Sequence, residues 1–202
     1  MVKNSIVEFI LKVEEISKIG LKYSTDPYAV DNYKQLQELA KKFISEQMNI
    51  ELQGDNFFVR DIYPTPNVSV RTIIFNKERD KVLLVREASD GGFSLPGGWS
   101  ELCLTPSESA LKEVWEEAGS KCILTHLVGV FDRYRDLKVG GLPEYILVFE
   151  GEIISEDNEP CFEIVEKGYY AIDNLPKWSA KNNPDQMKKI IEAARNKETL
   201  FD

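Results

Sequence analysis

The chain has 202 residues, 43% of them hydrophobic, and a formal net charge of -9 at pH 7. This length suits one domain of about 150 residues with a smaller appendage, and the negative charge argues against loose electrostatic binding to nucleic acids or anionic membranes. Three cysteines without C-x-x-C spacing and a single histidine without a nucleophile motif exclude a disulfide framework, a zinc site and a serine-type triad from our expectations.

Two amphipathic helices are expected at the start of the chain. Apolar residues recur at three- and four-residue spacing from Asn4 to Tyr23 and from Pro27 to about Gln47, with a Thr-Asp-Pro break at 25–27. A two-helix hairpin cannot bury such apolar stripes by itself. We therefore predict a helical domain at 1–64 that forms a homodimer, followed by a second domain at 65–202.

The second domain opens with strand patterns. Val68 to Phe75 and Lys81 to Arg86 are rich in β-branched or apolar residues and are joined by a polar turn, which predicts a β-hairpin. Residues 93–96 form a further short strand that leads into Gly97 and Gly98. Because these glycines have no side chains, the backbone there can approach a metal ion or a phosphate closely.

A helix rich in carboxylates follows the glycine pair. Thr105, Pro106 and Glu108 have the pattern of a helix start with a capping box, and Gly119 is a typical stop. Neighbouring like charges destabilise a helix by about 0.2 to 0.5 kcal/mol per pair. The acidic arc is either a solvated surface or a site for a hard divalent cation such as Mg²⁺. It consists of Glu113, Glu116 and Glu117.

The rest of the chain alternates strands and a helix. Strands are expected at 122–132, 145–154 and 168–172, with a polar segment at 163–167 before the last of them. Asn183 is expected to cap a final helix. The alternation predicts an α/β/α sandwich with a mixed sheet. We see no apolar run of 18 residues and no leader-like start, and therefore expect a cytoplasmic protein with no membrane partner.

The segment 98–120 resembles the signature of the Nudix hydrolases, G-x5-E-x7-R-E-U-x-E-E-x-G-U, in which U is apolar. Three positions depart from it: Leu104 replaces a glutamate, Lys112 an arginine and Ser120 an apolar residue. Lys112 keeps the positive charge but loses the planar fork that binds a carboxylate with two hydrogen bonds. The matching residues are Gly98, Glu113, Val114, Glu116, Glu117 and Gly119.

A longer resemblance covers nearly the whole chain. The stretches 21–36, 65–71 and 82–99 are similar to Nudix enzymes with an N-terminal helical domain, a group that resembles CDP-choline pyrophosphatases and ADP-ribose pyrophosphatases. Within 65–71, Asn67 and Ser69 depart from the pattern of that group. The group also lacks the first signature glutamate, so the departure at Leu104 is expected within it.

The resemblance implies Mg²⁺-dependent hydrolysis of the diphosphate in a nucleoside diphosphate linked to another moiety, with Mn²⁺ as an alternative cofactor. It implies metal binding by Glu113, Glu116, Glu117 and the Gly97 carbonyl. Candidate catalytic groups are Glu113, Glu116 and Glu166, the last with a solvated surface glutamate as its alternative. Candidate substrate-binding residues are Arg71, Arg86 and Gly98, and a surface ion pair is an equal alternative for each arginine.

Two other functions stay open at this point. The missing carboxylate at Leu104 is consistent with a non-catalytic module that senses nucleotides, although three repelling glutamates argue against it. Cleavage at the 5' end of RNA suits the fold but not the acidic charge. We expect Glu101, on the same loop as Leu104, to fill the vacant acidic role.

Overall fold

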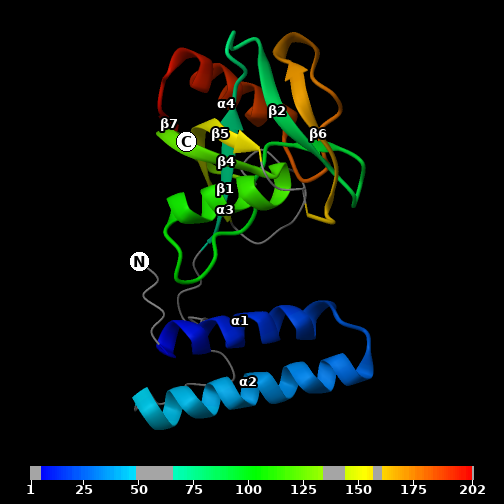
Figure 1. The fold of residues 1–202 in the computed structure, drawn as a ribbon, viewed down its shortest axis with the longest axis vertical. Coiled ribbons are helices and arrows are strands. Elements are labelled where there is room, and N and C mark those ends of the chain that lie inside the picture. The colour runs from blue at the N-terminus through cyan, green and yellow to red at the C-terminus, as the bar shows by residue number, and fades with distance from the viewer. Residues whose placement is uncertain (1–5, 49–65, 134–143, 157–160, 202) are drawn as a thin grey trace. The chain divides into compact units, whose positions relative to one another are not determined.

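The computed structural model describes residues 6–48, 66–133, 144–156 and 161–201 (Figure 1). These residues belong to two compact units, Met1–Pro64 and Thr65–Asp202. The predicted linker at 50–66 and the predicted loop at 133–144 lie almost wholly outside the described residues. No helix in the described ranges is long and apolar enough to cross a membrane.

The first unit is a helical hairpin of α1 (Ile6–Tyr23) and α2 (Pro27–Met48). Asp26 begins the second helix, because its carboxylate accepts hydrogen bonds from the Tyr28 and Ala29 amides at 2.8 and 3.4 Å. Gly20 packs directly against the Tyr33 ring, where a Cβ atom would not fit. The two predicted helices are therefore present and closely packed.

Much of the apolar surface of this hairpin is exposed. Phe9 is 60% exposed and Ile16 is 56% exposed, whereas the polar residues Glu14 and Ser17 of the same helix are buried. Exposed apolar surfaces of this kind are typical of sites that contact another molecule. We refer to this set as the apolar face of the hairpin; it comprises Ile6, Phe9, Ile16, Ile19, Tyr23, Tyr28, Leu36 and Leu39.

The second unit contains two β-sheets. The four-stranded sheet has the order β1-β5-β4-β7, and it is mixed, since β1 runs parallel to β5 whereas β5 and β4 are antiparallel. The three-stranded sheet has the order β3-β2-β6 and is antiparallel. The strands are β1 (Asn67–Ile74), β2 (Lys81–Glu87), β3 (Phe93–Ser94), β4 (Ser120–Asp132), β5 (Glu144–Glu156), β6 (Ile164–Ala171) and β7 (Leu200–Phe201).

Helices α3 (Pro106–Ala118) and α4 (Pro184–Asn196) pack on two separate hydrophobic cores. Neighbouring β1 residues divide between them: Ile73 lies in the core with α4, and Ile74 lies in the core with α3. Because successive strand residues point to opposite faces, the two helices cover opposite sides of the sheet (Figure 1). A short 3-10 turn, η1 (Ile172–Asn174), precedes α4. The predicted α/β/α arrangement, mixed sheet and helical hairpin are confirmed.

Two details of the predicted strands are wrong. β1 and β2 do not form a hairpin: they share a single bridge, Phe75 to Val82, and then separate into different sheets. Both strands are buried along most of their length, so their apolar pattern carries no information about their partners. The predicted polar segment 163–167 is mostly part of β6, an edge strand whose polar residues face solvent.

Candidate active site

The carboxylates of the site are carried by α3, whose ends are defined by local sequence. The Thr105 hydroxyl accepts a hydrogen bond from the Glu108 amide at 3.2 Å, and the Glu108 carboxylate accepts one from the Thr105 amide at 2.8 Å. Gly119 ends the helix with φ 58° and ψ 28°, a left-handed conformation that favours glycine. The predicted capping box and stop are both present, so the helix glutamates lie on a fixed frame.

The loop that contains Gly97 and Gly98, called the glycine loop below, runs along β1 and meets the acidic face of α3. The Val70 amide donates to the Gly98 carbonyl at 2.9 Å, and the Gly97 amide donates to Oε2 of Glu117 at 2.7 Å. Gly97 has φ 151°, and a Cβ atom there would collide with the Val70 carbonyl. A Cβ atom on Gly98 would lie 2.6 Å from Oε1 of Glu113. Both glycines are therefore required for the loop to touch the helix carboxylates.

Two of these carboxylates are poorly solvated. Burial, followed by the charge of Glu116, raises the pKa of Glu113 to about 7. Burial also raises the pKa of Glu117 to about 7, although the Gly97 amide opposes this shift. Glu117 is only 6% exposed. The pair therefore binds protons, or another positive charge, more readily than ordinary surface carboxylates do.

Arg71 lies on β1 directly beneath the glycine loop. It is 3% exposed, and its Nη1 donates to the Val70 carbonyl at 2.8 Å. Burial lowers its pKa, while the charge of Glu117 acts in the opposite direction. Among the described residues, its Nε atom has no hydrogen-bond partner. A buried donor of this kind, held beside two carboxylates, is suited to bind an anionic oxygen of a ligand.

Lys112 connects the helix to the preceding loop. Its ammonium lies 2.5 Å from Oε1 of Glu101 and donates to Oε2 of Glu116 at 3.0 Å. Although burial opposes the shift, these hydrogen bonds raise the pKa of Lys112. Glu101 also acts on the pKa of Glu113, so its carboxylate belongs to the same acidic cluster. Lys112 thus links Glu101 of the loop to Glu116 of α3 through a single ammonium, whereas an arginine could bind one carboxylate with two hydrogen bonds.

The residues present fit a divalent cation whose coordination a ligand completes. Within the described ranges, no three acidic, histidine or cysteine side chains are arranged to hold a metal ion by themselves. Mg²⁺ commonly binds to one or two protein carboxylates together with substrate phosphates and water. Glu113 and Glu117, with raised pKa values and a glycine loop in contact, are the two carboxylates that could serve as such ligands.

Two predicted site residues are paired with each other instead. Arg86 Nη1 lies 3.4 Å from Oε2 of Glu166, and both side chains are nearly half exposed. The Tyr170 hydroxyl donates to Oε1 of Glu166 at 2.6 Å. The surface ion pair considered for Arg86 is thus the geometry observed for that arginine. Gly97, Gly98, Arg71 and the three helix glutamates are, by contrast, brought together.

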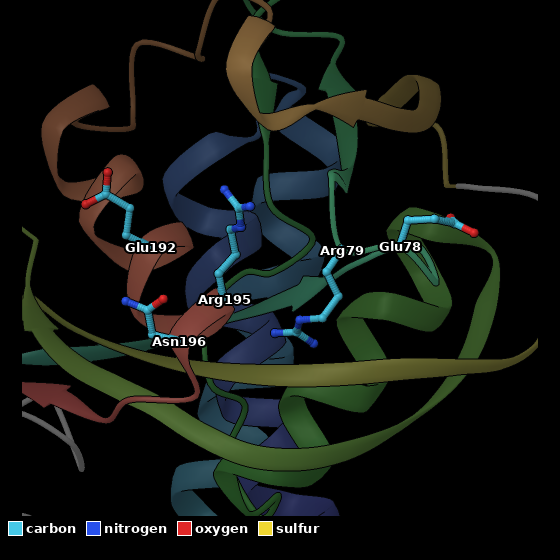
Figure 2. A pocket seen from close by; sticks show the side chains of 5 residues that line it. All are labelled: Glu78, Arg79, Glu192, Arg195 and Asn196. Atoms are coloured by element: carbon cyan, nitrogen blue, oxygen red, sulfur yellow. The ribbon is translucent and has the colours of Figure 1, made fainter.

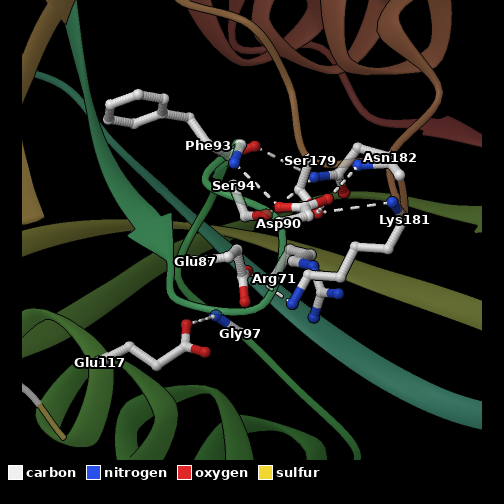
Figure 3. Close-up of polar contacts among 12 residues, drawn as sticks. Arg71, Glu87, Asp90, Phe93, Ser94, Gly97, Glu117, Ser179, Lys181 and Asn182 are labelled. Carbon is white, nitrogen blue, oxygen red and sulfur yellow. Dashed lines mark hydrogen bonds and ion pairs between the residues drawn. The ribbon is translucent and has the colours of Figure 1, made fainter. Parts of the chain in front are cut away.

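The structure adds charged groups that the sequence pattern did not indicate. Lys181 lies 2.5 Å from the buried carboxylate of Glu87 (Figure 3). Arg133 lies 2.7 Å from the buried carboxylate of Glu144. Ser69 also donates to Glu144, so this departure from the group pattern has a structural role. Only the alternation of β2, which turns Arg86 outward and Glu87 inward, could have indicated one of these groups.

A separate hollow of about 390 Å³ lies between the β1–β2 turn and α4 (Figure 2). It contains none of the α3 glutamates. Arg79 has both terminal nitrogens on Glu150, at 2.7 and 3.0 Å, and also donates to the Ala194 carbonyl. Its donors are therefore engaged, and the hollow does not compete with α3 as the candidate site. It is lined by Glu78, Arg79, Glu192, Arg195 and Asn196.

Two family models match the chain. Residues 65–193 match the NUDIX domain, and residues 4–54 match the model described as the UDP-X-like, N-terminal oligomerisation domain. One match therefore lies within each unit of the structure.

Individual relatives agree with these matches. YjhB of Bacillus subtilis (strain 168), provisionally named an ADP-ribose pyrophosphatase, is 30% identical over 207 residues that cover all of this chain and 99% of that protein. The crystal structure of a UDP-X diphosphatase is 26% identical, with a TM-score of 0.64 over 96% of each chain. That of an ADP-ribose pyrophosphatase from Streptococcus suis 89-1591 is 30% identical, with a TM-score of 0.59 over 68% of this chain and 100% of the other.

Proposed function

Because this chain belongs to the Nudix hydrolase family, we propose that it cleaves the diphosphate of a nucleoside diphosphate linked to another moiety, with Mg²⁺ as its cofactor. The observation that carries the proposal is the contact of Gly97 with Glu117, beside Glu113 and the buried Arg71. This arrangement offers oxygen ligands to a cation and a guanidinium to a phosphate within one small site.

Each residue has an assigned task. Glu113 and Glu117 would hold the cation together with the Gly97 carbonyl, and Arg71 would bind a non-bridging phosphate oxygen. When bound, the cation neutralises the charge of the diphosphate and makes an attacking water more acidic. Gly98 leaves the space in which the Glu113 carboxylate lies.

The proton of the attacking water needs an acceptor near the phosphate. Glu116 is our first choice, because Lys112 fixes its carboxylate at the acidic cluster. Glu166 is the alternative, although it lies with Arg86 and Tyr170 on β6. Comparing Glu116→Gln with Glu166→Gln separates the two: loss of turnover in only one variant identifies the acceptor.

The names of the relatives suggest which diphosphates to test. ADP-ribose is the first candidate substrate, a UDP-linked compound the second, and CDP-choline the third, on the family resemblance described above. Each would be incubated with Mg²⁺, with Mn²⁺ and with EDTA, and the products separated by chromatography. We expect cleavage of at least one diphosphate that depends on the cation. Absence of cleavage in every case, or equal rates with EDTA, would contradict the proposal and favour a nucleotide-sensing role.

We also propose that the protein is a homodimer formed through the apolar face of the hairpin. The matching N-terminal model is described as an oligomerisation domain, which supports self-association in general. The exposed residues supply the apolar surface that such an interface needs. Sedimentation of the intact protein would give twice the monomer mass of 23.1 kDa.

A further inference from the structure

The segment before α4 is firmly attached to the start of β3. The Phe93 amide donates to the Lys177 carbonyl, and the Ser179 amide donates to the Phe93 carbonyl, both at 2.9 Å. The side-chain amide of Asn182 donates to the Ser94 hydroxyl at 2.8 Å. These bonds fix the path of the backbone around Lys181 (Figure 3).

Two further groups strengthen this attachment. The Asp90 carboxylate accepts hydrogen bonds from the Ala180 amide at 2.7 Å and from the Ser179 hydroxyl at 3.0 Å. Arg133 donates to the Lys181 carbonyl at 2.9 and 3.3 Å. The segment is therefore held by a set of neutral and charge-assisted hydrogen bonds that does not include the Lys181 side chain.

The Lys181 side chain extends from this segment toward the candidate active site (Figure 3). Its ammonium lies 2.5 Å from Oε1 of Glu87, and its charge reaches Glu117, whose pKa it tends to lower. The Glu87 side chain is 8% exposed, whereas that of Lys181 is 33% exposed. The Lys181 side chain is thus partly exposed to solvent, although its ammonium contacts a buried carboxylate.

A purely structural ion pair is the alternative explanation for this contact. A buried ion pair adds little net stability, because desolvation of both charges offsets their attraction. The segment is already attached by other bonds, so the pair is not needed to hold it. A diphosphate bound near Glu113 and Glu117, by contrast, would bring further negative charge to an acidic site. It would require positive groups in addition to Arg71.

We propose that Lys181 is a phosphate-binding residue of this site, which Glu87 keeps aimed at the α3 carboxylates until a ligand arrives. On binding, the ammonium donates to a non-bridging oxygen of the diphosphate. Glu87 is then a positioning residue, which acts through Lys181. This inference rests on the proposed function for its substrate class, and on the Lys181–Glu87 contact near the candidate site for its location (Figure 3).

The first test compares Lys181→Met with Lys177→Met in the full-length protein. Lys177 lies in the same segment, but its side chain is exposed, so its loss is a matched control for the charge. A charge-assisted hydrogen bond to phosphate predicts a loss of about 10- to 100-fold in kcat/KM for Lys181→Met, mainly through KM. Lys177→Met should stay within about two-fold of wild type, and Lys181→Arg should recover part of the loss. Equal kinetics of the two methionine variants would overturn the inference.

A second comparison excludes a structural effect. Lys181→Met leaves the Glu87 carboxylate buried without its partner, which lowers stability, and the added change Glu87→Gln removes that cost. We expect the double variant to regain most of the lost Tm while its KM stays high. Recovery of both Tm and KM would show that the pair only stabilises the fold, and would refute a binding role.

A binding measurement separates this inference from the proposed function. Inorganic pyrophosphate is titrated calorimetrically into the wild type and Lys181→Met, both with Mg²⁺. We expect about ten-fold weaker binding by the variant. If the wild type cleaves no diphosphate, the proposed function fails, yet a ten-fold loss of pyrophosphate affinity would still support Lys181 as a phosphate ligand. Equal affinity, including no detectable binding by either protein, would overturn it.

Discussion

Replacing Glu117 with glutamine should stabilise the metal-free protein while it destroys activity. The pKa of Glu117 is raised from 4.5 to about 7, a difference of 2.5 units. At 1.36 kcal/mol per unit, ionisation of this carboxylate costs the folded state at most about 3 kcal/mol. Part of that cost is shared with Glu113, whose charge raises the pKa of Glu117. Glutamine has nearly the same size and keeps an oxygen that accepts the Gly97 hydrogen bond.

The direction of the pH dependence follows from proton binding. Between about pH 4.5 and 7, the folded wild type holds the Glu117 proton more tightly than the unfolded chain does. The contribution of this group to stability therefore falls as the pH rises through that window, and the full cost is present above pH 7. Glu117→Gln should show no such loss, so its advantage should be absent at pH 4 and largest at pH 8.

Urea unfolding in EDTA at pH 4 and pH 8, followed by tryptophan fluorescence, measures this difference. The exposed Glu192→Gln is a control that removes a glutamate charge without a burial cost. Turnover of Glu117→Gln with Mg²⁺ should fall by orders of magnitude, and Mg²⁺ should raise its Tm less than that of the wild type. A variant that is less stable than the wild type at pH 8 in EDTA, or that keeps its turnover, would refute the reasoning.

Gly98→Ala should lower turnover at least about ten-fold in a steady-state assay, because the added Cβ atom would displace the Glu113 carboxylate. Gly168→Ala is the control and should be tolerated, since a Cβ atom there would lie 3.4 Å from the nearest atom, in the Tyr170 ring. Glu101→Gln should shift the Mg²⁺ titration of activity to higher concentrations, since it removes one carboxylate from the acidic cluster; an unchanged titration would contradict its assigned role. The double variant Phe9→Glu, Ile16→Glu should sediment as a monomer with unchanged helical content, and a dimer that survives both charges would place the interface elsewhere.

Local sequence predicted the frame of the site well. The capping box of α3 depends on residues three positions apart, and its glycine stop on a single conformation, so Thr105, Glu108 and Gly119 could be assigned without tertiary information. The same helix carries the signature glutamates, which is why the family and the fold were predicted correctly. Spacing within one helix is fixed by its geometry, whatever lies around it.

Tertiary contacts between distant segments were beyond the sequence pattern. β1 pairs with β5, a partner that no local alternation identifies, whereas the short turn between β1 and β2 favours the incorrect prediction of a hairpin. Lys181 precedes a helix cap and has no neighbour in sequence that marks it as part of a site. Glu87 was not among the predicted site residues, although the alternation of β2 places it inward and Arg86 outward.

The parallel pairing of β1 with β5 also bears on how the protein folds. Ser69 and Glu144 are hydrogen-bonded although they lie 75 positions apart, so this part of the sheet closes a long loop before its contacts form. Contacts between α3 and β4, which are adjacent in sequence, close only short loops. A refolding chain should therefore regain its helical circular dichroism before β1 pairs with β5 and places Arg71 beside Glu113 and Glu117. Recovery of enzymatic activity should then lag behind recovery of secondary structure.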